Sequence, residues 1–219
     1  MKKNLKLIIF DLDGTLVDAY KAVSRSLNYA FKKIGLPPVD DDIIKRSVGW
    51  GDRNLIQRFV PLSLTAKALS IYRRHHKKAL KKGTKFLPGA KKILFGLKKR
   101  KYKLAIASNR PTLFTKIILK HLQADHLFDI ILCADKVKHP KPAGDILSAI
   151  LKKFKILPGE TLYVGDMTID VETAKNAGVK SVIVLTGSSQ REEIVPLKPF
   201  KIIDRLADLS SFLEKIYVC

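Results

Sequence analysis

Over most of the chain, short apolar runs alternate with longer stretches in which apolar and basic residues recur at helical spacing. A short apolar run bounded by polar residues is typical of a parallel strand that is buried on both faces. Such runs are LKLIIF (5–10), YKLAIA (102–107), FDIILCA (128–134), TLYVG (161–165) and SVIVL (181–185). Helical patterns separate the later runs, over PGAKKILFGLKK (88–99), TLFTKIILKHL (112–122), DILSAILKKF (145–154) and DVETAKNAG (170–178). The alternation predicts an α/β fold, with a parallel sheet and helices on both faces.

One stretch, residues 17–84, breaks this alternation because it contains no convincing strand. Its helical segments include AYKAVSRSLNYAFKKIG and TAKALSIYRRHHKKALKKG. An insertion of this length directly after the first strand predicts a small helical module of its own. The remaining residues, 1–16 and 85–219, then form the core. In the tail, PFKIIDRLADLSSFLEKIYV predicts an edge strand followed by a closing helix.

The start of the chain, MKKNLKLIIF, combines basic and apolar residues as a signal peptide does. Its apolar part is too short for one, and Asp11 and Asp13 interrupt it, so we interpret it as the first strand of a soluble protein. No apolar run approaches the ~20 residues that cross a membrane. The cysteines, Cys133 and Cys219, lack metal-type spacing and indicate no disulfide framework, which favours a reducing cytoplasm.

The net charge is +22, from 42 Lys and Arg residues against 20 Asp and Glu residues. The lysines gather over residues 77–85, 98–101 and 152–153, where solvated helix faces explain each cluster taken singly. The summed field should attract anions, whether phosphorylated metabolites, nucleic acids or acidic membranes. No basic segment is interleaved with aromatic residues, so we expect no specific nucleic-acid partner.

Polar side chains follow the predicted strands at the points where those strands end. They are Asp11 and Asp13 after the first strand, Ser108 and Asn109 after the second, Lys141 after the third, and Asp166 and Asp170 after the fourth. Each has an ordinary structural interpretation, as a turn, a helix N-cap, a first-turn acid or a solvated lysine. The carboxyl ends of parallel strands meet at one edge, where ligands bind, so together these residues predict a single site.

The motifs DLDGT (11–15), SN (108–109), KP (141–142) and GDMTID (165–170) resemble those of the haloacid dehalogenase-like hydrolases, a superfamily made mostly of phosphatases. The resemblance covers essentially the full chain and implies a Rossmann-like core with an inserted α-helical cap, here residues 17–84. The segments LVDAYKAVSRSLNYAFKKIGLP and VGWGDRNLI look like phosphoglycolate phosphatases and their sugar-phosphate relatives, the β-phosphoglucomutase-like group. The implied function is a Mg²⁺-dependent phosphatase that acts on a small phosphorylated metabolite.

The resemblance also implies catalytic roles. Asp11 would attack phosphorus to give an aspartyl-phosphate, and Asp13 would protonate the leaving oxygen and later take a proton from water. Ser108 and Lys141 would hold the phosphoryl oxygens. The dehalogenases lack an acid at the position of Asp13, so this residue favours a phosphatase or a phosphomutase.

The implied Mg²⁺ site has oxygen ligands, as that ion prefers. Its ligands would be the Asp11 carboxylate, the Asp13 backbone carbonyl and Asp166, with Asp170 in a supporting role nearby. The expected contacts with the anionic substrate come from the backbone N–H groups around Gly14 and from Thr15, Asn109, Gly49 and Arg53.

Four further residues carry expectations of their own. Gly144 stands where relatives often have proline and should loosen the loop that follows Lys141. Trp50, between two glycines, either packs against a substrate or fills the seam between cap and core. His75 and His76, in a lysine-rich helix, are expected to be exposed and not to bind metal.

Two other functions stay open at this point. A phosphomutase of the same fold would return the phosphoryl group to a sugar, although no clear acid or base in the cap supports it. A nucleic-acid-binding protein would use the basic surface, although no recognition motif supports it.

Overall fold

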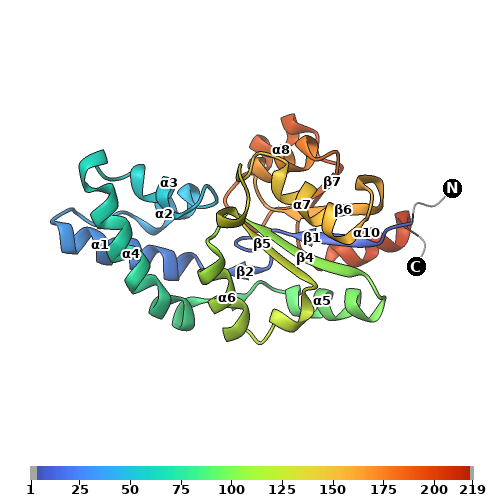
Figure 1. The fold of residues 1–219 in the computed structure, drawn as a ribbon, viewed down its shortest axis with the longest axis horizontal. Coiled ribbons are helices and arrows are strands. Elements are labelled where there is room, and N and C mark those ends of the chain that lie inside the picture. Colours follow the sequence, from blue (N-terminus) through green and yellow to red (C-terminus); the bar gives the residue numbers. More distant parts are fainter. Residues whose placement is uncertain (1–3, 218–219) are drawn as a thin grey trace.

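The computed structural model describes residues 4–217 and contains a six-stranded parallel sheet (Figure 1). Its strands, in the order in which they lie side by side, are β5 (Ile130–Cys133), β4 (Lys103–Ser108), β1 (Leu7–Phe10), β6 (Thr161–Gly165), β7 (Lys180–Val184) and β8 (Lys201–Ile203). All four residues of β1 are fully buried, as a central strand covered on both faces requires. The chain therefore reaches the carboxyl edge of the sheet at Asp11, in the middle of the molecule.

Helices cover both faces of this sheet, as predicted. On one face pack α5 (Ala90–Lys99), α6 (Thr112–His121) and α10 (Asp208–Ile216), and on the other α7 (Asp145–Phe154) and α8 (Thr168–Asn176). Side chains of β1 alternate between the two cores: Ile8 and Phe10 belong to the first, Leu7 and Ile9 to the second. The short helix α9 (Arg191–Ile194) adds a smaller cluster with α8 and β7.

Residues 19–84, inserted between β1 and the rest of the core, fold as helices that lie to one side of the sheet (Figure 1). These are α1 (Tyr20–Ile34), α2 (Asp41–Ser47), α3 (Asp52–Gln57) and α4 (Leu62–Gly83). They share a hydrophobic cluster of their own, in which Leu27 and Phe31 of α1 pack with Tyr72 of α4. The division into a core and a cap over residues 17–84 stays a prediction, which this separate cluster supports.

A two-stranded antiparallel ribbon stands where the helical segment leaves and re-enters the core. It pairs β2 (Val17–Asp18) with β3 (Lys85–Phe86), and Lys85 Nζ lies 3.6 Å from Asp18 Oδ2. The expectation of no strand within residues 17–84 is wrong at β2. A strand of two residues is too short to produce the period-two alternation that identifies a strand in a sequence.

Element boundaries differ from the predicted runs by a few residues at most, and β6 and α7 have the predicted bounds. Gly178 follows α8 with φ +67°, as a residue just beyond a helix C-terminus often does. Cys133 is fully buried, whereas Cys219 lies outside the described residues. Between residues 4 and 217, no helix has the length and apolar character needed to cross a membrane.

Candidate active site

Asp11 extends β1 by one residue and lies at the centre of the carboxyl edge. Its N–H donates to Val164 O at 2.8 Å, which fixes its backbone in the sheet, and its side chain is buried. Lys141 Nζ is 3.1 Å from Asp11 Oδ1, but the geometry is that of an ion pair and this oxygen accepts no well-aligned hydrogen bond. Burial raises the pKa of the Asp11 carboxyl to about 7, against the opposing effect of the Lys141 ammonium. The carboxylate thus has spare capacity to bind a cation.

Lys141 is held next to Asp11 by Asp170. Its ammonium donates to Asp170 Oδ1 at 2.7 Å and to the Tyr163 hydroxyl at 3.1 Å. The same Asp170 oxygen accepts from the Tyr163 hydroxyl at 2.8 Å, and the other accepts the backbone N–H groups of Asp166 and Met167. Burial lowers the pKa of an ammonium, but the two carboxylates outweigh that effect and raise the pKa of Lys141. Asp170 therefore positions the lysine, and its supporting role toward a metal stays a prediction.

Asp166 follows β6 and is fully buried. Its Oδ1 accepts the Thr15 hydroxyl at 2.8 Å and its Oδ2 accepts the Ser188 N–H at 3.2 Å. A Cβ on Gly187 would lie 1.6 Å from Asp166 Oδ2, so only glycine fits there. Burial, with two neighbouring carboxylates, raises the pKa of Asp166 well above its usual range. The Thr15 hydroxyl therefore supports Asp166, and a contact between Thr15 and substrate stays a prediction.

Three buried carboxylates gather at this point. One oxygen each from Asp11, Asp166 and Asp170 lie within 4.8 Å of one another. Lys141 brings a single positive charge to the cluster. Burial first, and the neighbouring carboxylates second, raise the pKa values of Asp11 and Asp166. A hard divalent cation such as Mg²⁺, which takes oxygen ligands, fits this donor set.

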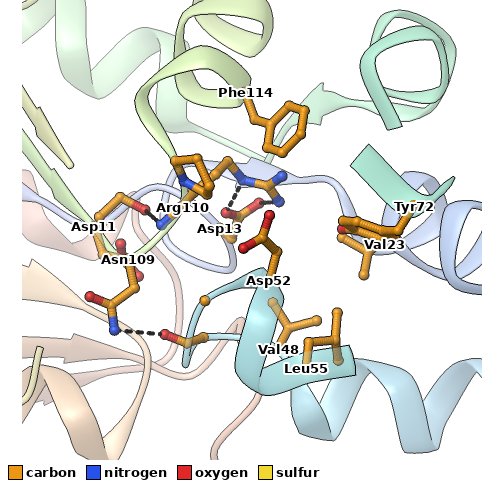
Figure 2. Close-up of a pocket in the computed structure, with 14 residues that line it drawn as sticks. Asp11, Asp13, Val23, Val48, Asp52, Leu55, Tyr72, Asn109, Arg110 and Phe114 are labelled. Carbon is orange, nitrogen blue, oxygen red and sulfur yellow. Dashed lines mark hydrogen bonds and ion pairs between the residues drawn. The ribbon is translucent and has the colours of Figure 1, made fainter. Parts of the chain in front are cut away.

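Asp13, two residues beyond Asp11, directs its side chain toward Arg110 (Figure 2). Arg110 Nε donates to Asp13 Oδ2 and Nη2 to Oδ1, both at 2.7 Å, which makes a bidentate ion pair. Burial lowers the pKa of a guanidinium, but Asp13 outweighs it and the pKa of Arg110 is raised. The sequence analysis did not identify Arg110 as a residue of the site. The only feature of the sequence that pointed to it is its position directly after Ser108 and Asn109.

Asn109 connects the cap with the loop that carries Lys141. Its Oδ1 accepts the Lys141 N–H at 3.0 Å, and its Nδ2 donates to Lys141 O at 3.1 Å and to Gly49 O at 3.2 Å. The Ser108 hydroxyl accepts the Arg110 N–H at 3.2 Å. The amide of Asn109 therefore positions the loop, and a contact between Asn109 or Gly49 and substrate stays a prediction.

A pocket opens between the cap and the carboxyl edge (Figure 2). Its lining residues are Asp11, Asp13, Val23, Val48, Gly49, Gly51, Asp52, Leu55, Tyr72, Ser108, Asn109, Arg110, Pro111 and Phe114. The side formed by the carboxyl edge of the sheet is polar, and the cap side is mainly apolar. The exception is Asp52, whose carboxylate accepts two hydrogen bonds from Arg73, at 2.7 and 3.0 Å. Among the described residues that line the pocket, Arg110 is the one cation.

Two cap residues singled out in the sequence lie outside this pocket. Arg53 is exposed and lines a separate hollow with Arg73, Arg74 and Lys77. Trp50 is half-buried and lines a shallow hollow with Asn54, Gln57 and Arg58. In this structure neither side chain reaches the carboxylates, and a contact between Arg53 and substrate stays a prediction.

The Gly14 N–H donates to Val17 O at 2.9 Å and so closes a turn. A contact between substrate and the backbone N–H groups around Gly14 stays a prediction. A Cβ on Gly144 would lie 2.8 Å from the backbone of Asn176, and a looser loop at this glycine stays a prediction as well. One local expectation is wrong. His76 is fully buried, not exposed. Its signal was the spacing Tyr72–His76–Leu80, which places it on the buried face of α4.

The parallel sheet and the buried carboxylates at its carboxyl edge are the features by which this protein can be assigned to a class of enzymes. Residues 8–184 match the family described as "Haloacid dehalogenase-like hydrolase", and the chain belongs to this family of enzymes.

Several proteins similar to this chain are named phosphoglycolate phosphatase. The chain is 31% identical over 195 residues to the phosphoglycolate phosphatase of Aquifex aeolicus (strain VF5), covering 88% of this chain and 90% of that relative. It is 32% identical over 223 residues to the phosphoglycolate phosphatase of Pasteurella multocida (strain Pm70), covering 95% and 98%. The crystal structure of "a predicted phosphoglycolate phosphatase" from Haemophilus somnus 129pt has a TM-score of 0.89 at 27% identity, covering 95% of this chain and 97% of that one.

Proposed function

We propose that the chain is a Mg²⁺-dependent phosphatase that hydrolyses a small phosphorylated metabolite through an aspartyl-phosphate on Asp11. The observation that carries this proposal is the Asp11 carboxylate, which lines the pocket and lies 3.1 Å from Lys141. Membership of the hydrolase family and the names of the relatives support it. A cytoplasmic location stays a prediction from the cysteine content.

The proposed reaction has two halves. In the first, a bond forms between an Asp11 oxygen and phosphorus while the bond from phosphorus to the substrate oxygen breaks, and Asp13 gives that oxygen a proton. In the second, Asp13 takes a proton from a water molecule that attacks phosphorus, which releases inorganic phosphate and restores Asp11. The Lys141 ammonium and the Ser108 hydroxyl stabilise the charge on the phosphoryl oxygens.

The residues present fit the metal that this chemistry implies. Asp11 and Asp166 would hold Mg²⁺ together with the Asp13 carbonyl. Asp170 would stand behind them, because both of its oxygens already accept hydrogen bonds. When bound, Mg²⁺ would supply positive charge that balances the carboxylates and the phosphoryl oxygens.

We propose phosphoglycolate, the substrate in the relatives' names, as the first candidate metabolite. The organic part of the substrate would occupy the cap side of the pocket, where Val48, Leu55 and Tyr72 lie. The residues that close over the substrate therefore decide which metabolite is accepted.

The test is hydrolysis of p-nitrophenyl phosphate with Mg²⁺, followed by a panel containing phosphoglycolate, hexose phosphates, nucleotides and pyrophosphate. Asp11→Asn should abolish turnover, because the amide is not a nucleophile, and a chelator should do the same reversibly. Substantial hydrolysis by the purified Asp11→Asn protein would contradict the mechanism. Transfer of the phosphoryl group to an added sugar instead of water would indicate the mutase.

A further inference from the structure

Arg110 is bound from both sides, by the core and by the cap. Two of its nitrogens contact the Asp13 carboxylate, and a third, Nη1, lies 2.7 Å from His76 Nε2 on α4. Arg110 is 9% exposed and His76 is 0% exposed. A buried chain of contacts therefore runs from helix α4 of the cap to the carboxylate proposed to move the proton.

The contacts of His76 define its tautomer. A guanidinium nitrogen only donates, so His76 Nε2 must carry a lone pair and accept. The Ser26 hydroxyl donates to Ala22 O at 2.7 Å, and it therefore accepts at its contact of 3.0 Å with His76 Nδ1. His76 is consequently neutral, with its proton on Nδ1.

The surroundings of His76 keep it neutral and fixed. Its ring stacks on Tyr72, with centroids 4.7 Å apart, and meets the edge of Phe114 at 5.0 Å. Burial and the neighbouring Arg110 lower the pKa of His76 to about 2, and His75 contributes in the same direction. No acidic side chain contributes to that shift, so His76 offers Arg110 an acceptor without a competing negative charge.

We propose that His76 is a positioning residue, which holds the Arg110 guanidinium in the orientation that directs the Asp13 carboxylate into the pocket. This inference rests on the proposed function, in which Asp13 is the acid and base. A bidentate pair between two flexible side chains can rotate as a unit. A third hydrogen bond, to a ring that Tyr72 and Phe114 hold in place, removes that freedom.

The alternative is that His76 only fills the space beneath the cap. Two variants of similar size separate these roles. His76→Gln keeps an acceptor oxygen that can reach the position of Nε2, whereas His76→Leu removes it. Both variants lose the hydrogen bond to Ser26, so their difference isolates the contact with Arg110.

The first measurement is kcat/KM, which reports the steps up to release of the alcohol. We compare p-nitrophenyl phosphate, whose leaving group needs no proton, with an alkyl phosphate, whose leaving group needs one. His76→Leu should lower kcat/KM for the alkyl ester about 10- to 100-fold more than for the nitrophenyl ester. His76→Gln should restore most of that loss at an equal melting temperature. His121→Leu, at an exposed histidine of α6, is the control and should change neither value.

Equal losses for both esters, or no recovery in His76→Gln, would overturn the inference while leaving the proposed phosphatase intact. Wild-type protein that hydrolyses no phosphomonoester would overturn both.

A second measurement does not depend on turnover. The measurement is a long-range ¹H–¹⁵N spectrum of the wild-type protein, in which the His76 signals are assigned by their absence from the spectrum of His76→Gln. Throughout the range from pH 5 to 8, Nδ1 of His76 should carry a proton and Nε2 should not. A proton on Nε2 would overturn the inference.

Discussion

Burial in the fold disfavours ionisation of the Asp11 carboxyl group. Its folded pKa of about 7 stands above the ordinary value of 3.8 because it lies among other carboxyl groups and away from water. As the proposed nucleophile, Asp11 must be ionised, so nearby positive charge must offset the free energy that its ionisation costs. Lys141 supplies part of this positive charge, and a bound divalent cation would supply the rest.

We expect the stability of the metal-free protein to depend on pH through Asp11. Between pH about 4 and about 7 the folded protein holds a proton that the unfolded chain has lost, so the contribution of Asp11 to stability falls as pH rises through that interval. The measurement is the melting temperature in chelator across pH 5 to 8, for wild type and Asp11→Asn. The wild type should lose stability relative to the variant as pH rises, and Mg²⁺ should offset the loss most at pH 8. A constant difference would contradict the assignment.

Asp52 places a carboxylate on the apolar side of the pocket, paired with Arg73. A substrate with a second negative charge, such as phosphoglycolate, would meet this residue. Asp52→Asn removes the like charge and leaves Arg73 unpaired nearby. The ratio of kcat/KM for phosphoglycolate to that for p-nitrophenyl phosphate should therefore rise about tenfold.

The matched control for this change is Asp204→Asn, which breaks an exposed Asp–Arg pair with Arg191 that does not line the pocket. It should leave the ratio unchanged. If Asp52→Asn also leaves it unchanged, Asp52 does not influence selection among anionic substrates.

At the scale of elements, the strands of the six-stranded sheet could be predicted from the sequence, whereas the short ribbon of β2 and β3 and the partners of individual side chains could not. Asp11, Lys141 and Asp166 could be placed together because each follows a buried strand, and parallel strands end at one edge. Arg110 lies in the turn between β4 and α6, where the sequence does not indicate whether a basic residue is buried. The spacing of His76 places it on the buried face of α4, but its contact with Arg110 joins residues that are 34 positions apart in the chain. Thr15 was placed in the correct region, but its hydroxyl partner depends on β6, which lies far away in the sequence.

The loop between β5 and α7 depends on a close contact at Gly144. A Cβ there would lie 2.8 Å from the backbone of Asn176, the last residue of α8, so the loop meets the end of this helix. Gly144→Ala should lower the free energy of unfolding by about 1–3 kcal/mol, as overpacking does. Because the same loop carries Lys141, kcat/KM should fall as well.

Gly96→Ala is the control for this change, since a Cβ there meets nothing within 4 Å. Alanine is the better helix former, so this variant should be stabilised by about 0.5–1 kcal/mol in chemical denaturation. Equal behaviour of the two variants would show that the contact at Gly144 is not tight.

At the scale of the whole molecule, the charge of +22 is spread over different helices. The lysines of 77–82, 98–99 and 152–153 belong to α4, α5 and α7, and all but Lys98 are exposed. No single face collects them, as a nucleic-acid groove would require. We therefore expect the charge to act as a diffuse attraction for anions.

Salt should weaken this attraction without changing the chemistry. For a multiply charged phosphate whose association limits the rate, kcat/KM should fall as ionic strength rises from about 0.01 to 0.15 M, while kcat changes little. RNA and DNA should bind weakly, without sequence preference, and dissociate near physiological salt. Tight, sequence-selective binding at that salt concentration would contradict this view.

The ribbon of β2 and β3 holds the two ends of the helical segment next to each other. Asp18 and Lys85 are paired neighbours, although the whole of α1–α4 lies between them in the chain. For the sheet, the helical segment is equivalent to the loop of a hairpin, since its length does not change the distance between its two ends. Segments of other lengths and sequences could therefore be grafted between the same two strands, and each would face Asp11 from the same side. New substrate preferences could arise by exchange of one contiguous piece of gene, with the carboxylates at the edge of the sheet left in place.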